Sequence, residues 1–265
     1  MAPAGVSCGR SPERVASVAS TPGHCEFRFH GALNAFLAPA LRDRGFTHVF
    51  DGTPAVKDRI ESLGVPHTEV GRILVDGEAV PFARRVRGGE RVEVHPDAAG
   101  PATALLRPAL PMPPRFVLDV HLGRLAGYLR LLGFDTLYRN DYRDGELIAL
   151  SRLAGRVALS RDTGLLKRAE LVHGAFVHAT DPRRQLREVV DRFGLAGWIR
   201  PFARCARCNG LVVPLARADQ ANGVPADMAA RGAALSHCSG CGQVYCQGSH
   251  QARLRQRLAE VGVSI

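Results

Sequence analysis

The sequence contains no run of eighteen consecutive apolar residues, the length that a membrane-spanning helix needs. Its first residues also lack the charged and then apolar layout of a secretory signal. From these two absences we expect a cytoplasmic protein that does not enter a membrane. Lysine is scarce as well, so arginine carries almost all of the positive charge behind the net charge of +10.

The positive charge is unevenly spread along the chain. Counting Lys and Arg against Asp and Glu gives +1 for residues 1–114, +5 for residues 115–200 and +4 for residues 201–265. A basic balance favours nucleic acid as a partner, through phosphate contacts and counterion release. An arginine-rich, GC-rich coding bias is the other explanation of this charge.

The composition predicts a globular chain of more than one domain. Hydrophobic residues make up 46% and charged residues 23% of 265 residues, which leaves room for two domains or slightly more. Residues 1–24 are small and polar without periodicity, and we expect them to be disordered. Residues 98–114 are rich in Ala, Pro and Gly and are expected to form a linker.

Between these segments, residues 25–97 predict a small α+β unit. Residues 25–30 and 91–95 alternate like strands, and Asp76-Gly77 is typical of a hairpin turn. Thr53-Pro54 predicts the start of a helix that ends at Gly64. His67 and Glu69 lie in a short segment that is either a protein-contact site or an ordinary surface loop.

Residues 115–200 alternate between apolar runs and helical periodicity, in the order strand, helix, strand, helix, strand. This order predicts a parallel α/β sheet, whose ligands bind outside the carboxyl ends of the strands. Acidic residues stand near those ends: Asp119 after the first strand, Asp141, Asp144 and Glu146 after the second, and Asp162 after the third.

Carboxylates that converge at one edge repel one another unless they hold protons or a divalent cation. Oxygen ligands of this kind suit Mg²⁺ or Mn²⁺, which can activate water for attack on a phosphodiester. The sequence therefore predicts metal-assisted phosphodiester hydrolysis. Alternatively, Asp141, Asp144 and Asp162 are turn or helix-cap residues, because Asp is favoured at both places.

Residues 201–265 contain two Cys-x2-Cys pairs, Cys205 with Cys208 and Cys238 with Cys241. This spacing predicts a ribbon in which four thiolates bind Zn²⁺ tetrahedrally, with no ligand position left for water. The zinc role is therefore structural. Cys246 is a fifth local thiol and His250 a nearby imidazole, and we assign neither a function; a basic C-terminal helix follows.

Several runs resemble a PIN-like ribonuclease domain family named for the C-terminal domain of the Mut-seven exonuclease. They are Phe116 to Asp119, Leu122 to Ala126, Leu129 to Thr136, and Ser160 to Asp162. Members of that family carry a C-terminal zinc ribbon, and some carry a ubiquitin-like domain in front. The resemblance implies that Asp119, Asp144 and Asp162 bind the catalytic metal, with Asp141 and Glu146 as further members, and that Arg124 and Arg161 face the phosphate.

The segment from Gly64 to Val70 and the turn Asp76-Gly77 resemble the family's ubiquitin-like, sulfur-carrier-like (β-grasp) domain. Sulfur carriers of this fold end in a free Gly-Gly tail. Here Gly88-Gly89 precedes the last strand, so we interpret this unit as a binding or scaffolding domain with a protein partner.

We therefore expect a ubiquitin-like domain at 25–97, a PIN-like nuclease domain at 115–200 and a zinc ribbon at 201–265. The predicted function is divalent-metal-dependent RNA hydrolysis, with the ribbon assisting RNA binding. The alternative is a non-catalytic RNA-binding or adaptor protein. A sulfur-transfer accessory and a toxin of a toxin–antitoxin pair fit less well, because of the missing tail and the additional domains.

Overall fold

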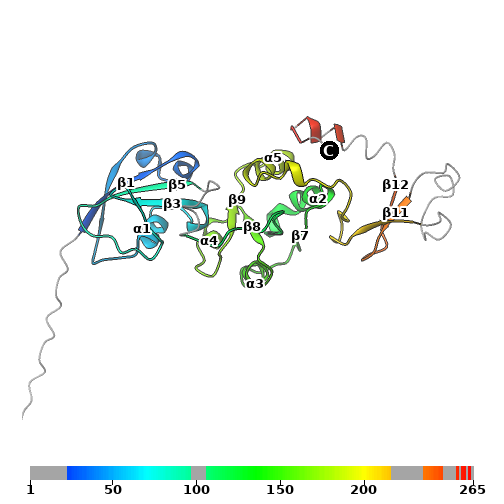
Figure 1. Cartoon of the computed structure of the whole chain (residues 1–265), viewed down its shortest axis with the longest axis horizontal. Coiled ribbons are helices and arrows are strands. Elements are labelled where there is room, and N and C mark those ends of the chain that lie inside the picture. Colours follow the sequence, from blue (N-terminus) through cyan, green and yellow to red (C-terminus); the bar gives the residue numbers. More distant parts are fainter. Residues whose placement is uncertain are drawn as a thin grey trace, which may run out of the picture.

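The computed structural model describes residues 23–96, 106–215, 235–246, 255–256, 258–260 and 262–263. Three parts follow one another along the longest axis: an N-terminal α+β unit, a central α/β unit and a C-terminal ribbon (Figure 1). This confirms the predicted fold class. Most of the segment expected to be disordered lies outside the described residues, as do Cys8, His250 and half of the predicted linker.

The N-terminal unit is a β-grasp sheet. Its strand order is β2-β1-β5-β3-β4, in which β1 pairs parallel with β5 and antiparallel with β2. Alternate residues of β1 point inward, so Cys25, Phe27 and Phe29 join the core with Val56 and Ile60 of the helix. The elements are β1 (Gly23–Phe29), η1 (Gly31–Phe36), η2 (Pro39–Leu41), β2 (Phe46–Phe50), α1 (Val56–Ser62), η3 (His67–Glu69), β3 (Val70–Val75), β4 (Glu78–Ala79) and β5 (Arg91–Pro96).

The expected helix start at Thr53-Pro54 is wrong, although the hairpin at Asp76-Gly77 is confirmed. The helix begins at Val56, because the preceding residues pair with a distant segment instead. The Pro54 carbonyl accepts a hydrogen bond from the Val86 N–H, and Ala55 forms an antiparallel bridge with Arg85.

The central unit is a parallel sheet of order β7-β6-β8-β9 between two helical layers. Phe116 and Leu118 pack with α2 and α5 on one face, whereas Val117 packs with α3 and α4 on the other. The elements are β6 (Phe116–Leu118), η5 (Val120–Leu122), α2 (Gly123–Leu131), β7 (Thr136–Leu137), α3 (Asp144–Ala154), β8 (Val157–Ser160), α4 (Thr163–Leu166), β9 (Gly174–Phe176), α5 (Pro182–Arg192) and η6 (Ala196–Trp198).

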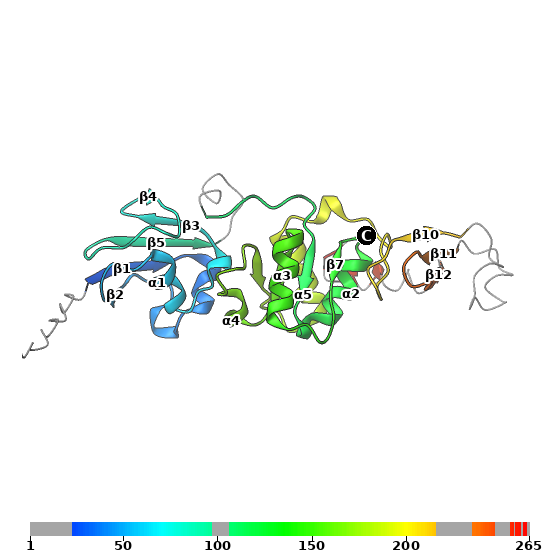
Figure 2. The ribbon, with the colours of Figure 1, turned by 90° about the horizontal axis from the view of Figure 1, so that it is seen from below.

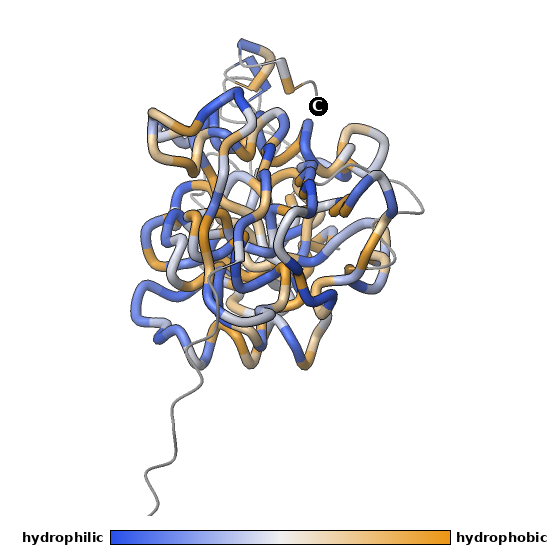
Figure 3. Tube along the Cα trace, turned by 90° about the vertical axis from the view of Figure 1, so that its left-hand side faces the viewer, coloured by the Kyte–Doolittle hydropathy of each residue, from blue (hydrophilic) through white to orange (hydrophobic). Residues whose placement is uncertain are grey.

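The C-terminal ribbon contains β10 (Val212–Pro214), β11 (Leu235–Cys238) and β12 (Val244–Cys246), in antiparallel order. Figure 2 shows it beyond the end of α2, on the side away from the β-grasp unit. The chain then returns to the central unit, where Leu258 and Val263 are buried in the core beside α5. In Figure 3, apolar and polar stretches alternate along the coloured part of the trace. The two larger units have separate hydrophobic cores. Within the described residues, no helix is long and apolar enough to cross a bilayer.

Candidate functional site

Asp119 and Asp162 lie at the carboxyl ends of adjacent strands and share one serine. The Ser160 hydroxyl donates to Asp119 Oδ2 at 2.6 Å and accepts from the Asp162 backbone N–H at 2.9 Å. Ser160 is fully buried, Asp119 is half-buried and Asp162 is exposed. The serine thus fixes the two acidic positions relative to each other at the edge of β6 and β8.

Both aspartates also have local structural bonds. Asp119 Oδ1 accepts from the Val120 N–H at 2.6 Å, and Asp162 Oδ1 accepts from the Gly164 N–H at 2.7 Å as the N-cap of α4. The cap interpretation is therefore correct for Asp162. The bonds from Val120 and Gly164 each engage Oδ1, and Oδ2 of Asp119 accepts from Ser160 as well, so both oxygens of Asp119 already have a donor.

The remaining acids lie after β7, and a tyrosine ties this loop to the Asp119 segment. The Tyr138 hydroxyl donates to the Val120 carbonyl at 3.0 Å. Asp141 is exposed and forms a two-bond pair with Arg139, which lowers its pKa. Glu146 accepts from the Arg143 N–H at 3.1 Å, and Asp144 is the exposed first residue of α3.

The structure does not draw these carboxylates into one tight group. Among the described residues, three or more potential ligand atoms within 4.8 Å of one another occur at two places only, the four cysteines and the group His30, Glu93 and His95. Repulsion between ionised carboxylates gives a physical reason for their separation. Asp119 and Asp162 share one edge of the sheet and Asp144 begins the helix after β7, so these segments would have to come closer together to hold one ion.

The two arginines expected to face phosphate differ in their surroundings. Arg124 is exposed in the first turn of α2, just after the Asp119 segment. Arg161 Nη1 instead donates to the carbonyls of Val177, His178 and Ala179 at 2.6–2.9 Å. That guanidinium fastens the chain that leaves β9, a role that the sequence did not reveal.

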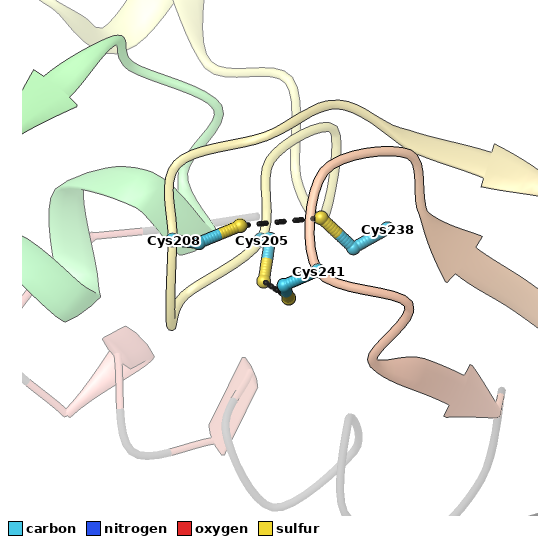
Figure 4. A group of neighbouring side chains, drawn as sticks. All are labelled: Cys205, Cys208, Cys238 and Cys241. Carbon is cyan, nitrogen blue, oxygen red and sulfur yellow. Dashed lines mark hydrogen bonds between the residues drawn. The ribbon is translucent and has the colours of Figure 1, made fainter.

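Four cysteines converge in the ribbon, as the spacing predicts (Figure 4). The Sγ atoms of Cys208 and Cys238 are 3.3 Å apart, and those of Cys205 and Cys241 are 3.7 Å apart. Backbone N–H groups of Gly210 and Gly240 point at two of these sulfurs. Four soft donors at this spacing fit a tetrahedral ion and leave no ligand position for water.

Cys205 is prepared to act as a thiolate. Its burial opposes ionisation, but the Tyr245 hydroxyl donates to its Sγ at 3.0 Å, and this bond with backbone N–H bonds lowers the pKa of Cys205 to about 6. Tyr245 lies on β12, next to Cys246, whose backbone pairs with Leu235. The tyrosine is therefore a supporting residue of the site that the cysteine spacing alone does not indicate.

Asp135 and Asn209 join the cysteine loop to the central unit. Asn209 Nδ2 donates to Asp135 at 2.8 Å, and its Oδ1 accepts from the Thr136 N–H at 3.0 Å. The buried Arg130 adds bonds from Nη1 to the carbonyls of Ala206 and Arg207. The loop that carries Cys205 and Cys208 is thus bound directly to the end of α2 and to β7.

The η3 segment docks on β9, the edge strand of the central sheet. Glu69 Oε1 accepts from the Phe176 N–H at 2.6 Å, and both Glu69 oxygens receive bonds from Arg192. His67 Nε2 is 2.9 Å from the Leu171 carbonyl. His67 and Glu69 are therefore neither an exposed surface loop nor a free site for another protein: both are buried in a contact made within the chain.

His30, Glu93 and His95 form a second polar group, on the β-grasp sheet. The two imidazole rings stack with centroids 4.1 Å apart, and Glu93 lies 3.2 Å from His30 Nε2 and 3.9 Å from His95 Nε2. Burial, then the charges of His30 and Arg72, lower the pKa of His95. The i, i+2 spacing of Glu93 and His95 on one strand is the only sequence signal for this group. His30 joins it through the parallel pairing of two strands, a tertiary contact that local sequence does not indicate.

Comparison with known proteins accounts for most of the chain. A family model described as the Mut7-C ubiquitin matches residues 23–100, and one described as the Mut7-C RNAse domain matches residues 114–258. No curated protein matches the chain. The solution structure of the Haloferax volcanii HVO 2177 protein is 20% identical, covering 35% of this chain and 99% of that one, and its TM-score of 0.25 is too low to support a structural argument. The RNAse model alone matches more than half of the present chain, which therefore belongs to the Mut7-C RNAse domain family, with the family's ubiquitin-like domain in front.

Proposed function

We propose that the protein is a divalent-metal-dependent ribonuclease that hydrolyses RNA phosphodiester bonds at the carboxyl edge of the central sheet. The observation that carries this proposal is the shared serine, since Ser160 holds Asp119 and Asp162 at the ends of adjacent strands. Membership of a ribonuclease domain family supports the same reaction class. We further propose that residues 25–97, 115–200 and 201–265 are separate domains with separate roles: partner binding, RNA hydrolysis and assistance in RNA binding.

In this mechanism the carboxylates of Asp119 and Asp162 would hold the ion, that of Asp119 while it also accepts from Val120 and Ser160. Asp144, the first residue of α3, would be the third ligand, with Asp141 and Glu146 at nearby positions of the chain. Hard carboxylate oxygens suit Mg²⁺ or Mn²⁺, which when bound would supply activation of water and charge stabilisation at the phosphate. Arg124, exposed in the first turn of α2, is proposed to bind the phosphate, and Arg161 to assist while it holds the β9 loop.

We propose Zn²⁺ as the ion of the four-cysteine site, in a structural role, because soft thiolates select it and four of them complete its shell. Residues 201–265 then add a formal charge of +4 after the nuclease domain, suited to RNA phosphates. A cytoplasmic location and a protein partner for the exposed part of the ubiquitin-like domain complete the proposal.

The test is incubation of the full chain with labelled single-stranded and hairpin RNAs, with Mn²⁺, with Mg²⁺ and without either ion. We expect products only with a divalent ion, and their loss in Asp119→Asn and Asp162→Asn variants whose thermal midpoints stay near that of the wild type. RNA binding that is indifferent to Mg²⁺ and Mn²⁺, with no product under any condition, would favour the adaptor function instead.

A further inference from the structure

A pocket of about 400 Å³ lies at the amino ends of β6 and β7, the sheet edge opposite to the acids. Three segments distant in sequence build it, where the central unit meets the start of the ribbon. Arg115 comes from the chain before β6, Phe134 and Asp135 from the chain before β7, and Trp198, Arg200 and Arg204 from the chain after α5. The mechanism proposed above uses none of these residues.

The pocket exposes an aromatic surface. Trp198, the only tryptophan of the chain, is 42% exposed, although a residue of this size and polarity is normally well buried. Its segment is held in place by the fully buried Leu195, whose carbonyl accepts from the Trp198 N–H at 2.9 Å. An exposed indole on a segment held in this way is a surface on which a nucleobase stacks, a contact worth about 1–3 kcal/mol per base.

The pocket also carries uncompensated positive charge. Arg115 and Arg200 are exposed; within the described residues their guanidinium groups donate only to the backbone carbonyls of Ala154 and Ile199, respectively, and pair with no acid. Asp135, the one acid of the lining, is engaged by Arg156 at 2.7 Å and by Asn209 at 2.8 Å, and it also pairs with Arg204 of the lining at 3.6 Å. Its negative charge is thus compensated by Arg156 and Arg204, and Arg115 and Arg200 leave the pocket with a net positive charge.

We propose that this pocket binds one nucleotide of single-stranded RNA, with the base stacked on Trp198 and the phosphate between Arg115 and Arg200. Its volume suits a ligand of that size. An acidic peptide would satisfy the arginines but would leave the indole without a flat partner, so RNA fits better. The choice of RNA as the ligand rests on the proposed function. The pocket itself lies at the sheet edge opposite to the carboxylates, so it would bind the RNA without cleaving it.

The sole tryptophan gives a direct readout. Short single-stranded RNA is titrated into the full-length Asp119→Asn variant, without added divalent metal, while Trp198 fluorescence is followed. We expect saturable quenching that weakens as salt is raised. Arg115→Gln combined with Arg200→Gln should weaken binding at least about tenfold, whereas Arg152→Gln, which removes an exposed arginine from α3, should leave the affinity unchanged.

A second readout separates stacking from charge. With end-labelled RNA followed by anisotropy, Trp198→Ala should weaken binding and Trp198→Phe should retain most of it. RNA binding without a change in Trp198 fluorescence, or equal quenching by a glutamate-rich peptide, would overturn the proposal. If RNA quenches Trp198 but the wild-type protein never cleaves RNA, the proposed function is refuted and this site stands. If the wild type cleaves RNA but the double arginine variant binds it with unaltered affinity, this site is refuted and the proposed function stands.

Discussion

At the scale of single residues, we would substitute Ser160 first, because its hydroxyl bonds both to Asp119 and to Asp162. In Ser160→Ala, Asp119 loses a donor at 2.6 Å and the Asp162 N–H loses its acceptor. We expect a loss of about 1–3 kcal/mol in the free energy of unfolding, as for other hydrogen bonds broken in a protein interior. We also expect a clear fall in RNA cleavage, measured under single-turnover conditions.

The matched control is Ser151→Ala. Ser151 is also buried and donates at 2.6 Å, but to the Arg156 carbonyl at the opposite edge of the sheet. It should destabilise the protein by a similar amount and leave cleavage by the folded protein unchanged. If the two variants lost activity equally, Ser160 would have only a structural role.

Two histidines of the β-grasp unit predict acid sensitivity. Burial lowers the pKa of His48 below its usual 6.5, with a further contribution from Arg59, and burial is also the main cause for His95. The unfolded chain therefore binds protons at a higher pH than the folded chain does. Stability should be fully present above about pH 6.5 and should decline as the pH falls through and below that value.

Urea denaturation between pH 7.5 and 5 measures this decline. The double variant His48→Gln and His95→Gln should show a flatter pH profile than the wild type, whereas His24→Gln, at an exposed position, should keep the original profile. An unchanged slope in the double variant would assign the acid sensitivity to other groups.

At the scale of elements, the contact of η3 with β9 fixes the first domain to the second. Glu69 is 4% exposed, and it receives both the Phe176 N–H of the edge strand and the guanidinium of Arg192. Removing one partner of a buried charge pair leaves the other uncompensated. For Glu69→Ala we expect a loss of about 3 kcal/mol in the free energy of unfolding.

The measurement is urea denaturation of the full chain, with Glu78→Ala on β4 as the control because that glutamate is exposed. The control should change stability by no more than about 0.5 kcal/mol. Equal stability of Glu69→Ala and wild type would show that the two domains do not depend on this contact in solution.

Elements also show where sequence reasoning succeeded and failed. Strand–helix alternation, an Asp-Gly turn and paired Cys-x2-Cys knuckles are local signals, and the corresponding sheet, hairpin and cysteine cluster are present. The helix start at Thr53 failed because Pro54 and Ala55 pair with residues 85 and 86, a contact that local propensity cannot contain. The docking of His67 and Glu69 on residues about 100 positions away has the same cause.

The candidate site divides in the same way. The positions of Asp119 and Asp162 follow from strand ends and parallel order, which periodicity predicts. The bridging hydroxyl of Ser160, the Arg161 contacts and the stacked pair His30 and His95 do not, because each depends on side-chain geometry between separate strands.

At the scale of the whole molecule, the ribbon should depend on its metal ion. Its described strands form no hydrophobic cluster of their own, so ion binding should supply much of its folding free energy. We expect a strong chelator to lower the thermal midpoint and to release the loop of Cys205 and Cys208 from Arg130 and Asp135. Added Zn²⁺ should reverse the change.

The Cys205→Ser variant should be destabilised without chelator and respond little to it. Cys25→Ala, which alters a buried cysteine of the β-grasp core, should respond to chelator as the wild type does. A wild-type protein with no chelator response would contradict the structural role of an ion in the ribbon.

The central claim, that the carboxyl edge of β6 and β8 binds the catalytic ion, is tested most directly by Mn²⁺ titration of the zinc-loaded chain, followed calorimetrically together with RNA cleavage. We predict that Asp119→Asn and Asp162→Asn lose Mn²⁺ binding and cleavage in parallel, while Glu170→Gln, which removes an exposed acid from the loop before β9, retains both. Unchanged Mn²⁺ affinity in the two aspartate variants would contradict the account, because the ion would then be bound elsewhere.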